Sequence, residues 1–133
     1  MEKLEHIGIA VKNLSHSKPL FEVLLNTNCY KEEVVETASV RTAFFSVGGQ
    51  KIELLESMDP NGIIARYIAK KGEGVHHLAF MVTDIEAEMK RLTEQGFELL
   101  NDEPMPGADN KLVCFLHPKN TNGVLIELCM EKP

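Results

Sequence analysis

Two histidines and two glutamates stand at matching places in the two halves of this 133-residue chain. His77 follows His6 by 71 positions and Glu127 follows Glu53 by 74, so the order histidine then glutamate occurs twice. Each lies inside an apolar segment, where an ionisable group is costly unless it is paired or bound to a metal. Imidazole nitrogen and carboxylate oxygen together suit Zn²⁺, Co²⁺, Mn²⁺, Ni²⁺ or Fe²⁺. The pattern predicts one divalent metal site with the ligands His6, Glu53, His77 and Glu127.

The segments around these residues repeat as well. Residues 4–14 align with residues 75–85, and residues 51–55 align with residues 125–129. A lone histidine on a strand is more often hydrogen-bonded in the core than a ligand, and a lone glutamate more often faces solvent. Neither explanation predicts the same order of residues twice in equivalent segments. The duplication therefore favours a ligand role for all four.

Alternation of side chains predicts that these segments are strands. In residues 4–11, His6 shares a face with Gly8 and Ala10, whose small side chains leave room for a ligand, and the isoleucines form the core face. Glu53, His77 and Glu127 likewise project from the face opposite their large aliphatic neighbours. The alternation thus predicts that one face of the strands carries the candidate metal ligands and that the other face packs into the hydrophobic core.

Two helices follow the repeated strands. Asn13 or Ser15 is expected to cap the first helix, and Thr83 or Asp84 the second, because their side-chain oxygens can accept bonds from free backbone amides. The remaining elements are predicted from apolar periodicity and from turn residues. The predicted order is a strand at 4–11, a helix ending at Asn26, strands at 29–35, 40–47 and 51–56, a helix at 63–71, a strand at 75–82, a helix ending at Gly96, and strands at 97–100, 111–116 and 124–130.

This order is a tandem βαβββ repeat. It predicts an α+β fold in which two half-repeats form a curved mixed sheet around one metal site. We expect a single domain over residues 1–133, with half-repeats 1–57 and 74–133 joined by a linker helix within 58–73.

Composition excludes several classes of partner. The net charge of −6 and the pI near 5.4 argue against nucleic acid or an anionic membrane. No apolar run approaches the roughly 20 residues of a membrane span, and the N-terminus enters a strand pattern without a signal peptide. Three cysteines without paired spacing predict reduced thiols in a cytoplasmic protein.

The repeated stretches resemble the vicinal oxygen chelate superfamily, which includes the glyoxalases, and within it the methylmalonyl-CoA epimerase family. The resemblance spans nearly the whole chain. Its most specific parts are the double histidine in the stretch GVHHLAF and the His-Pro-Lys turn that precedes GVLIEL. The matching residues are 6–11, 51–56, 74–80, 115–119 and 123–128.

This resemblance implies epimerisation at C2 of methylmalonyl-CoA, an acyl-CoA substrate and a homodimer. It implies that His6, Glu53, His77 and Glu127 bind a divalent metal, Co²⁺ or Zn²⁺, with Mn²⁺ or Ni²⁺ as alternatives. Such a metal would stabilise the enolate formed when the C2 proton leaves, and Glu127 is the expected acid–base residue. Some members of the family use a second glutamate from a first-half strand. The matching segment 38–43 has none, so water or a ligand carboxylate also remains a candidate.

Four other polar residues are candidates for the same site. His76 competes with His77, but the repeat register favours His77. His117 precedes a proline at a turn and is interpreted as a loop histidine, although a place at the substrate pocket stays open. Arg41 could neutralise a substrate carboxylate and Lys119 could contact CoA, but a solvent-facing strand arginine and a turn lysine are the simpler interpretations.

Other functions fit the same residues. A glyoxalase I-type enzyme acting on a thiol hemithioacetal would use the same four ligands. A non-enzymatic small-molecule-binding protein of the same fold would need no catalytic metal. An Fe(II) dioxygenase fits less well, because such sites use two histidines and one carboxylate.

Overall fold

The computed structural model describes residues 1–133 and contains two compact units, His6–His76 in one and Met1–Glu5 with His77–Pro133 in the other. Met1–Glu5 belongs with the second unit, where the Glu2 backbone N–H donates to the Met81 carbonyl over 2.8 Å. The elements follow the order β1 (Lys3–Ala10), α1 (Leu14–Leu25), β2 (Lys31–Val35), η1 (Glu36–Ala38), β3 (Val40–Val47), β4 (Gln50–Ser57), α2 (Ile63–Lys71), β5 (Gly74–Met81), α3 (Ile85–Glu94), β6 (Met105–Pro106), β7 (Lys111–Leu116), η2 (Pro118–Asn120) and β8 (Ile126–Glu131). This order confirms the predicted α+β fold with a tandem βαβββ repeat.

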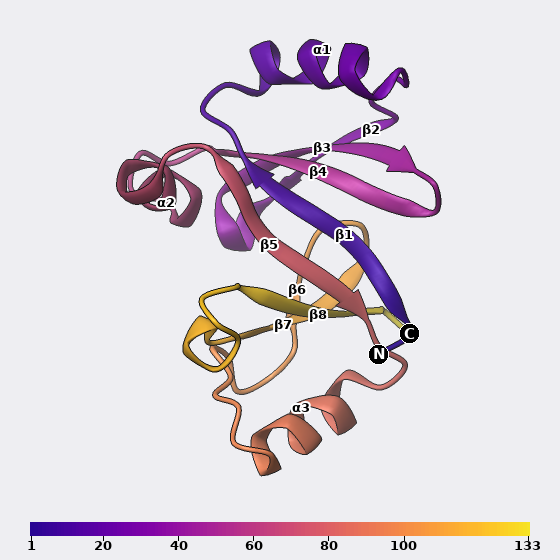
Figure 1. The fold of residues 1–133 in the computed structure, drawn as a ribbon, viewed down its shortest axis with the longest axis vertical. Coiled ribbons are helices and arrows are strands. Elements are labelled where there is room, and N and C mark those ends of the chain that lie inside the picture. The colour runs from indigo at the N-terminus through magenta and orange to yellow at the C-terminus, as the bar shows by residue number, and fades with distance from the viewer. The chain divides into compact units, whose positions relative to one another are not determined.

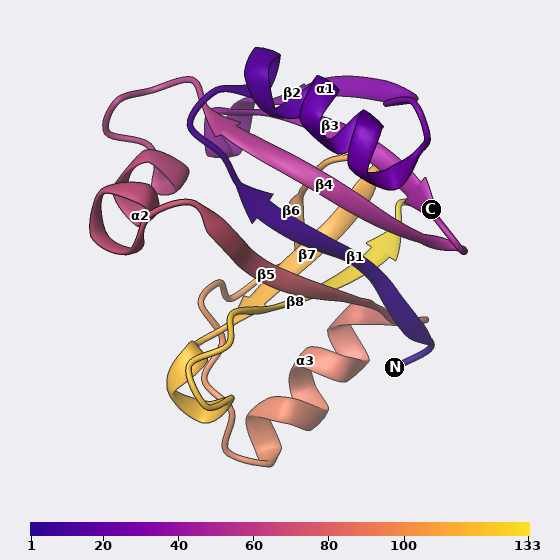
Figure 2. The same ribbon diagram turned by 45° about the horizontal axis from the view of Figure 1, so that its top comes forward.

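In the first unit, β2, β3, β4 and β1 are neighbours in that order. The β2–β3 and β3–β4 pairs are antiparallel and the β1–β4 pair is parallel. Helix α1 covers one face of this sheet (Figure 1, Figure 2) and packs on a core that includes Leu14, Phe45 and Leu54. Helix α2 closes one end of the opposite face through Ile64, which packs with Leu55. The rest of that face is left to the polar residues described below.

The second unit repeats this arrangement. β5, β8, β7 and β6 are neighbours, with β5–β8 parallel and the other pairs antiparallel. Helix α3 covers one face (Figure 1), where Ile85, Met89 and Leu92 pack against Cys114 and Leu128. Each half therefore has one face buried by its helix and one face free to carry other side chains.

The structure shows which of the predicted residues cap the two helices. The Asn13 side chain accepts a hydrogen bond from the His16 backbone N–H over 3.1 Å. Asp84 accepts one from the Ala87 N–H over the same distance. Asn26 ends α1 in the left-handed conformation, with φ of 51°, as predicted for a helix stop. Of the predicted alternatives, Asn13 and Asp84 are therefore the caps.

The predicted strand at 97–100 is wrong. Leu99 forms only an isolated bridge, and Asn101, just after the predicted strand, turns its side chain back on the neighbouring strand β7. The Asn101 Oδ1 accepts from the Phe115 N–H over 3.0 Å, so a side chain replaces part of the backbone ladder. The edge strand β6, Met105–Pro106, lies within the segment predicted to be a loop.

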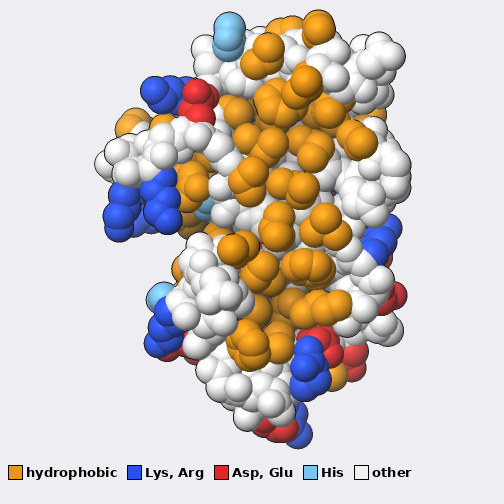
Figure 3. All heavy atoms as spheres, in the orientation of Figure 1, with side chains coloured by type: hydrophobic (Ala, Val, Ile, Leu, Met, Phe, Trp, Pro, Cys, Tyr) orange, Lys and Arg blue, Asp and Glu red, His pale blue; other side chains and the backbone are white.

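Helix α1 leaves Leu20, Val23 and Leu24 exposed. Figure 3 shows hydrophobic side chains over this helix. None of the helices is both long enough and apolar enough to cross a membrane.

Candidate functional site

His6 and Glu53 form a buried pair in the first unit. The His6 Nδ1 lies 3.0 Å from the Glu53 Oε2, and the two side chains are 7% and 4% exposed. In the parallel β1–β4 register, Gly8 is opposite Glu53 and Lys51 is opposite His6. Residues two apart on a strand share a face. Both side chains therefore project from the face that α1 does not cover.

His77 and Glu127 form the equivalent pair in the second unit. The His77 Nε2 lies 3.4 Å from the Glu127 Oε1, and the side chains are 6% and 8% exposed. Ala79 is opposite Glu127 in the parallel β5–β8 register. The offset between histidine and glutamate is thus the same as in the first unit. The face is again the one that the helix leaves uncovered.

The residues around the two glutamates repeat as well. On the antiparallel side, Phe44 and Phe115 are the direct partners of the two glutamates. On the parallel side the partners are Gly8 and Ala79. The Phe115 ring meets the His77 ring edge-on, with centroids 5.7 Å apart. Each carboxylate thus has a fixed aromatic neighbour on one side and a small residue, which leaves space, on the other.

The donor chemistry of both pairs fits a divalent metal. The buried groups whose donor atoms could hold an ion are His6, His77 and Glu127 in one set and Glu5, His6 and Glu53 in the other, so Glu5 joins the four predicted residues as a candidate. Nitrogen and oxygen donors suit Zn²⁺ or Co²⁺. The Cys114 thiol does not compete with these donors. Cys114 packs beneath α3 on the other face, and burial raises the pKa of its thiol to about 11, which keeps it protonated at neutral pH.

His76 packs against helix α2. Its ring meets the Tyr67 ring edge-on at 4.8 Å, and the Tyr67 hydroxyl donates to the Val75 carbonyl over 2.8 Å. Burial lowers the pKa of His76 to about 4, so the ring is neutral at physiological pH. The structure thus places His76 in the contact between α2 and the start of β5.

The other polar candidates have ordinary surface partners. The His117 Nδ1 accepts from the Lys119 backbone N–H over 3.0 Å, and the Lys119 ammonium lies 3.0 Å from Glu98. Arg41 is exposed and pairs in register with Glu56, on the α1 side of the sheet. These contacts agree with a turn histidine, a turn lysine and a solvent-facing arginine.

Sequence reasoning missed a charged pair on the same face as Glu53. The Lys31 Nζ lies 3.2 Å from the Glu33 Oε1 and 5.2 Å from the centre of the Phe44 ring. Alternation along β2 shows that Lys31 and Glu33 share a face, but only the register with β3 shows which face it is.

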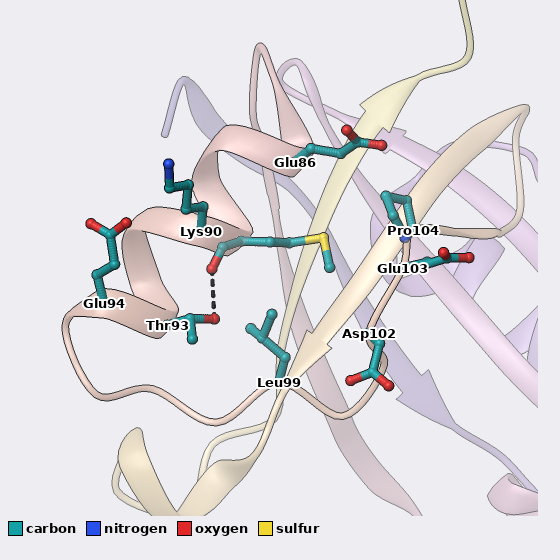
Figure 4. Close-up of a pocket in the computed structure, with 9 residues that line it drawn as sticks. Glu86, Lys90, Thr93, Glu94, Leu99, Asp102, Glu103 and Pro104 are labelled. Atoms are coloured by element: carbon teal, nitrogen blue, oxygen red, sulfur yellow. Dashed lines mark hydrogen bonds between the residues drawn. The ribbon is translucent and has the colours of Figure 1, made fainter.

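A groove in the second unit contains none of the predicted site residues. It has a volume of about 470 Å³ and lies between α3 and the segment 99–104 (Figure 4). Inside it the Thr93 hydroxyl donates to the Met89 carbonyl over 2.8 Å. It adjoins the helix-covered face, away from Glu127. Its lining residues are Glu86, Met89, Lys90, Thr93, Glu94, Leu99, Asp102, Glu103 and Pro104.

Comparisons with known proteins agree with this architecture. The model of the glyoxalase/bleomycin resistance protein/dioxygenase superfamily matches residues 5–115. An ethylmalonyl-CoA/methylmalonyl-CoA epimerase from Cereibacter sphaeroides is 35% identical, over 95% of this chain and 96% of its own. The methylmalonyl-CoA epimerase structure from Mycobacterium tuberculosis is 33% identical, with a TM-score of 0.92 over 98% of this chain and 88% of its own. A methylmalonyl-CoA epimerase in complex with methylmalonyl-CoA is 34% identical, with a TM-score of 0.91 over 98% and 95% of the two chains.

Proposed function

Because the chain belongs to the glyoxalase/bleomycin resistance protein/dioxygenase superfamily, we propose that it is a methylmalonyl-CoA epimerase, an isomerase that interconverts the (R) and (S) forms of its substrate. The observation that supports this reaction is the similarity to epimerases over almost the whole chain. The superfamily fold alone leaves the reaction open.

We propose that His6, Glu53, His77 and Glu127 bind one divalent metal, with Co²⁺ or Zn²⁺ preferred over Mn²⁺ or Ni²⁺. The support is the duplication of the pair, its burial in both units, and the 3.0 and 3.4 Å donor separations. When bound, a divalent metal supplies the positive charge that stabilises an enolate oxygen.

Glu127 is the proposed acid–base residue. Its carboxylate removes the C2 proton of the substrate and returns it, while the neighbouring His77 and Phe115 fix its position. A buried carboxylate is suited to this task because water does not compete for the proton. Ala79 on the parallel side leaves the space that the substrate needs.

The whole chain is proposed to act as one glyoxalase-like domain, residues 1–133, with half-repeats 1–57 and 74–133. We propose a homodimer, which the family resemblance implies, and a cytoplasmic location, with which three free cysteines agree.

The test is proton exchange at C2. The protein is stripped with a chelator, reloaded with Co²⁺ or Zn²⁺, and incubated with methylmalonyl-CoA in D₂O while the C2 signal is followed by NMR. We expect exchange only with metal, and its loss in His77→Ala and Glu127→Ala. The loop variant His117→Ala is the control and should exchange at the wild-type rate.

Absence of exchange in every metallated form would contradict the proposal. Turnover of the methylglyoxal hemithioacetal would then support a glyoxalase I-type lyase. Full affinity of the metal-free protein for a small ligand, without turnover, would support a binding protein.

A further inference from the structure

All the charged residues of helix α2 are positive. Three of its nine residues are basic, namely Arg66, Lys70 and Lys71, and none is acidic. The three side chains are exposed, and none of them is paired with a carboxylate. Figure 3 shows a group of basic side chains at the position of this helix. In a protein with a net charge of −6, such a group creates a local positive potential that attracts anions.

These cations differ from the paired lysines elsewhere on the surface. In the first unit, the Lys18 ammonium lies 3.0 Å from Glu32. In the second unit, Lys119, which the sequence offers as a CoA contact, lies 3.0 Å from Glu98. The charge of each of these lysines is therefore balanced within the fold, whereas the charges of α2 are not.

The carboxylates that follow and precede α2 in the chain have other partners. The Glu73 Oε2 accepts a hydrogen bond from the Lys12 backbone N–H over 2.7 Å. The Asp59 Oδ1 accepts one from the Asn61 backbone N–H over 2.9 Å. Both carboxylates thus fix the backbone of the connections around α2 and leave its cations without a counter-charge.

The spacing of the cations works against the stability of the helix itself. Arg66 and Lys70 are four residues apart, so they stand on neighbouring turns of one side, where like charges repel each other. The helix dipole favours Lys70 and Lys71 in the last turn. It gives no such benefit to Arg66, which lies near the other end. An anion held between Arg66 and Lys70 would remove this repulsion.

Helix α2 stands at the edge of the face that carries the proposed metal ligands of the first unit. Ile64 of α2 packs with Leu55 of β4. Leu55 is two residues beyond Glu53, so the two side chains share a face and lie roughly 7 Å apart along the strand. The basic surface of α2 therefore begins close to the proposed site and extends away from it.

Tyr67 connects this basic surface to the start of β5. Its ring meets the His76 ring edge-on at 4.8 Å, and its hydroxyl donates to the Val75 carbonyl over 2.8 Å. The Lys71 ammonium lies 5.9 Å from the centre of the Tyr67 ring. Tyr67 thus holds one of the three cations next to the residues that precede His77.

An acyl-CoA has the charge distribution that this surface fits. Its 3′-phosphate and pyrophosphate are separated from the thioester by the long pantetheine chain. When the acyl group reaches the proposed metal ligands, the phosphates therefore lie outside the site, beyond its edge. Arginine and lysine are the side chains that bind phosphate oxygens best. We propose that Arg66, Lys70 and Lys71 bind the phosphate groups of the acyl-CoA substrate.

This inference rests on the proposed function, and a truncated substrate tests it. Methylmalonyl-pantetheine has the same reacting atoms as methylmalonyl-CoA but no phosphate. For the Co²⁺-loaded double variant Arg66→Gln/Lys70→Gln, we expect the KM for methylmalonyl-CoA to rise roughly 10-fold at unchanged kcat, as two exposed ion pairs together would give. With methylmalonyl-pantetheine, the variant and the wild type should have equal KM.

Calorimetric binding of propionyl-CoA gives a second measurement that needs no turnover, and the affinity of the double variant should fall by the same factor. Lys3→Gln/Lys90→Gln is the charge-matched control, because it removes two exposed lysines from other elements, and it should bind as the wild type does. Arg66→Lys/Lys70→Arg keeps both charges and should restore most of the affinity.

Wild-type affinity of Arg66→Gln/Lys70→Gln for propionyl-CoA would overturn the inference. An equal rise in KM for methylmalonyl-pantetheine would also overturn it, because it would show a structural effect on the site. Loss of ATP binding with unchanged affinity for propionyl-CoA would assign the cations to a separate nucleotide and overturn it as well. A wild-type protein that exchanges C2 of neither substrate would contradict the proposed function, and propionyl-CoA binding would then still decide the role of α2.

Discussion

At the scale of single residues, β4 offers a matched pair of glutamates. Glu53 is buried beside His6, whereas Glu56 faces the other side of the sheet and pairs in register with Arg41. We expect Glu53→Ala to weaken Zn²⁺ or Co²⁺ affinity at least ~10-fold, because loss even of a residue that only supports a ligand costs 10- to 100-fold.

Glu56→Ala should bind the metal as the wild type does. Competition with a chromophoric chelator measures both affinities. Equal affinity in the two variants would remove Glu53 from the ligand set.

Much of the candidate site could be predicted at this scale. The duplication pointed to His6 and His77 without any structure, since two equivalent strands place equivalent residues on one face. Glu33 could not be found in this way. A shift of one residue in the register between β2 and β3 would turn Glu32, and not Glu33, to the face that carries Glu53. The turn at 36–39 sets this register, and its sequence does not determine it.

At the scale of elements, the helix caps give the clearest stability prediction. Asn13→Ala and Asp84→Ala each remove a side-chain acceptor for a free helical N–H. Each should lower the free energy of unfolding by about 1 kcal/mol. Ser15→Ala is the control, because Ser15 lies within α1 and does not cap it. Urea unfolding followed by circular dichroism measures all three, and an equal loss in Ser15→Ala would contradict the assignment.

The difference between the predicted strand at 97–100 and the structure has a local cause. Apolar residues at 97–100 are typical of a strand, but Asn101 satisfies the Phe115 N–H with its side chain and ends the backbone pairing. Periodicity measures which residues are buried, and it does not report a side chain that takes the place of a backbone partner. The caps were predictable because they depend on residue type at a helix end, which is a local property.

At the scale of the whole molecule, the number of bound metals distinguishes one shared site from two separate ones. Each unit has its own histidine–glutamate pair, so independent sites would bind two ions per chain. We expect one Co²⁺ or Zn²⁺ per chain, measured by elemental analysis after gel filtration. We also expect the midpoint of thermal unfolding to rise with free metal concentration, as mass action requires. Two ions per chain would contradict the shared site.

The place of the first five residues affects what happens when the chain is cut between its two halves. Met1–Glu5 belongs with the unit formed by His77–Pro133, to which Glu2 is hydrogen-bonded. A cut anywhere between α2 and β5 therefore leaves Met1–Glu5 on the N-terminal fragment, although these residues belong to the unit that the C-terminal fragment carries. Neither fragment then contains every residue of the second unit. Reassembly of the cut protein becomes a bimolecular step, as in split reporter proteins, and would depend on the concentrations of both fragments.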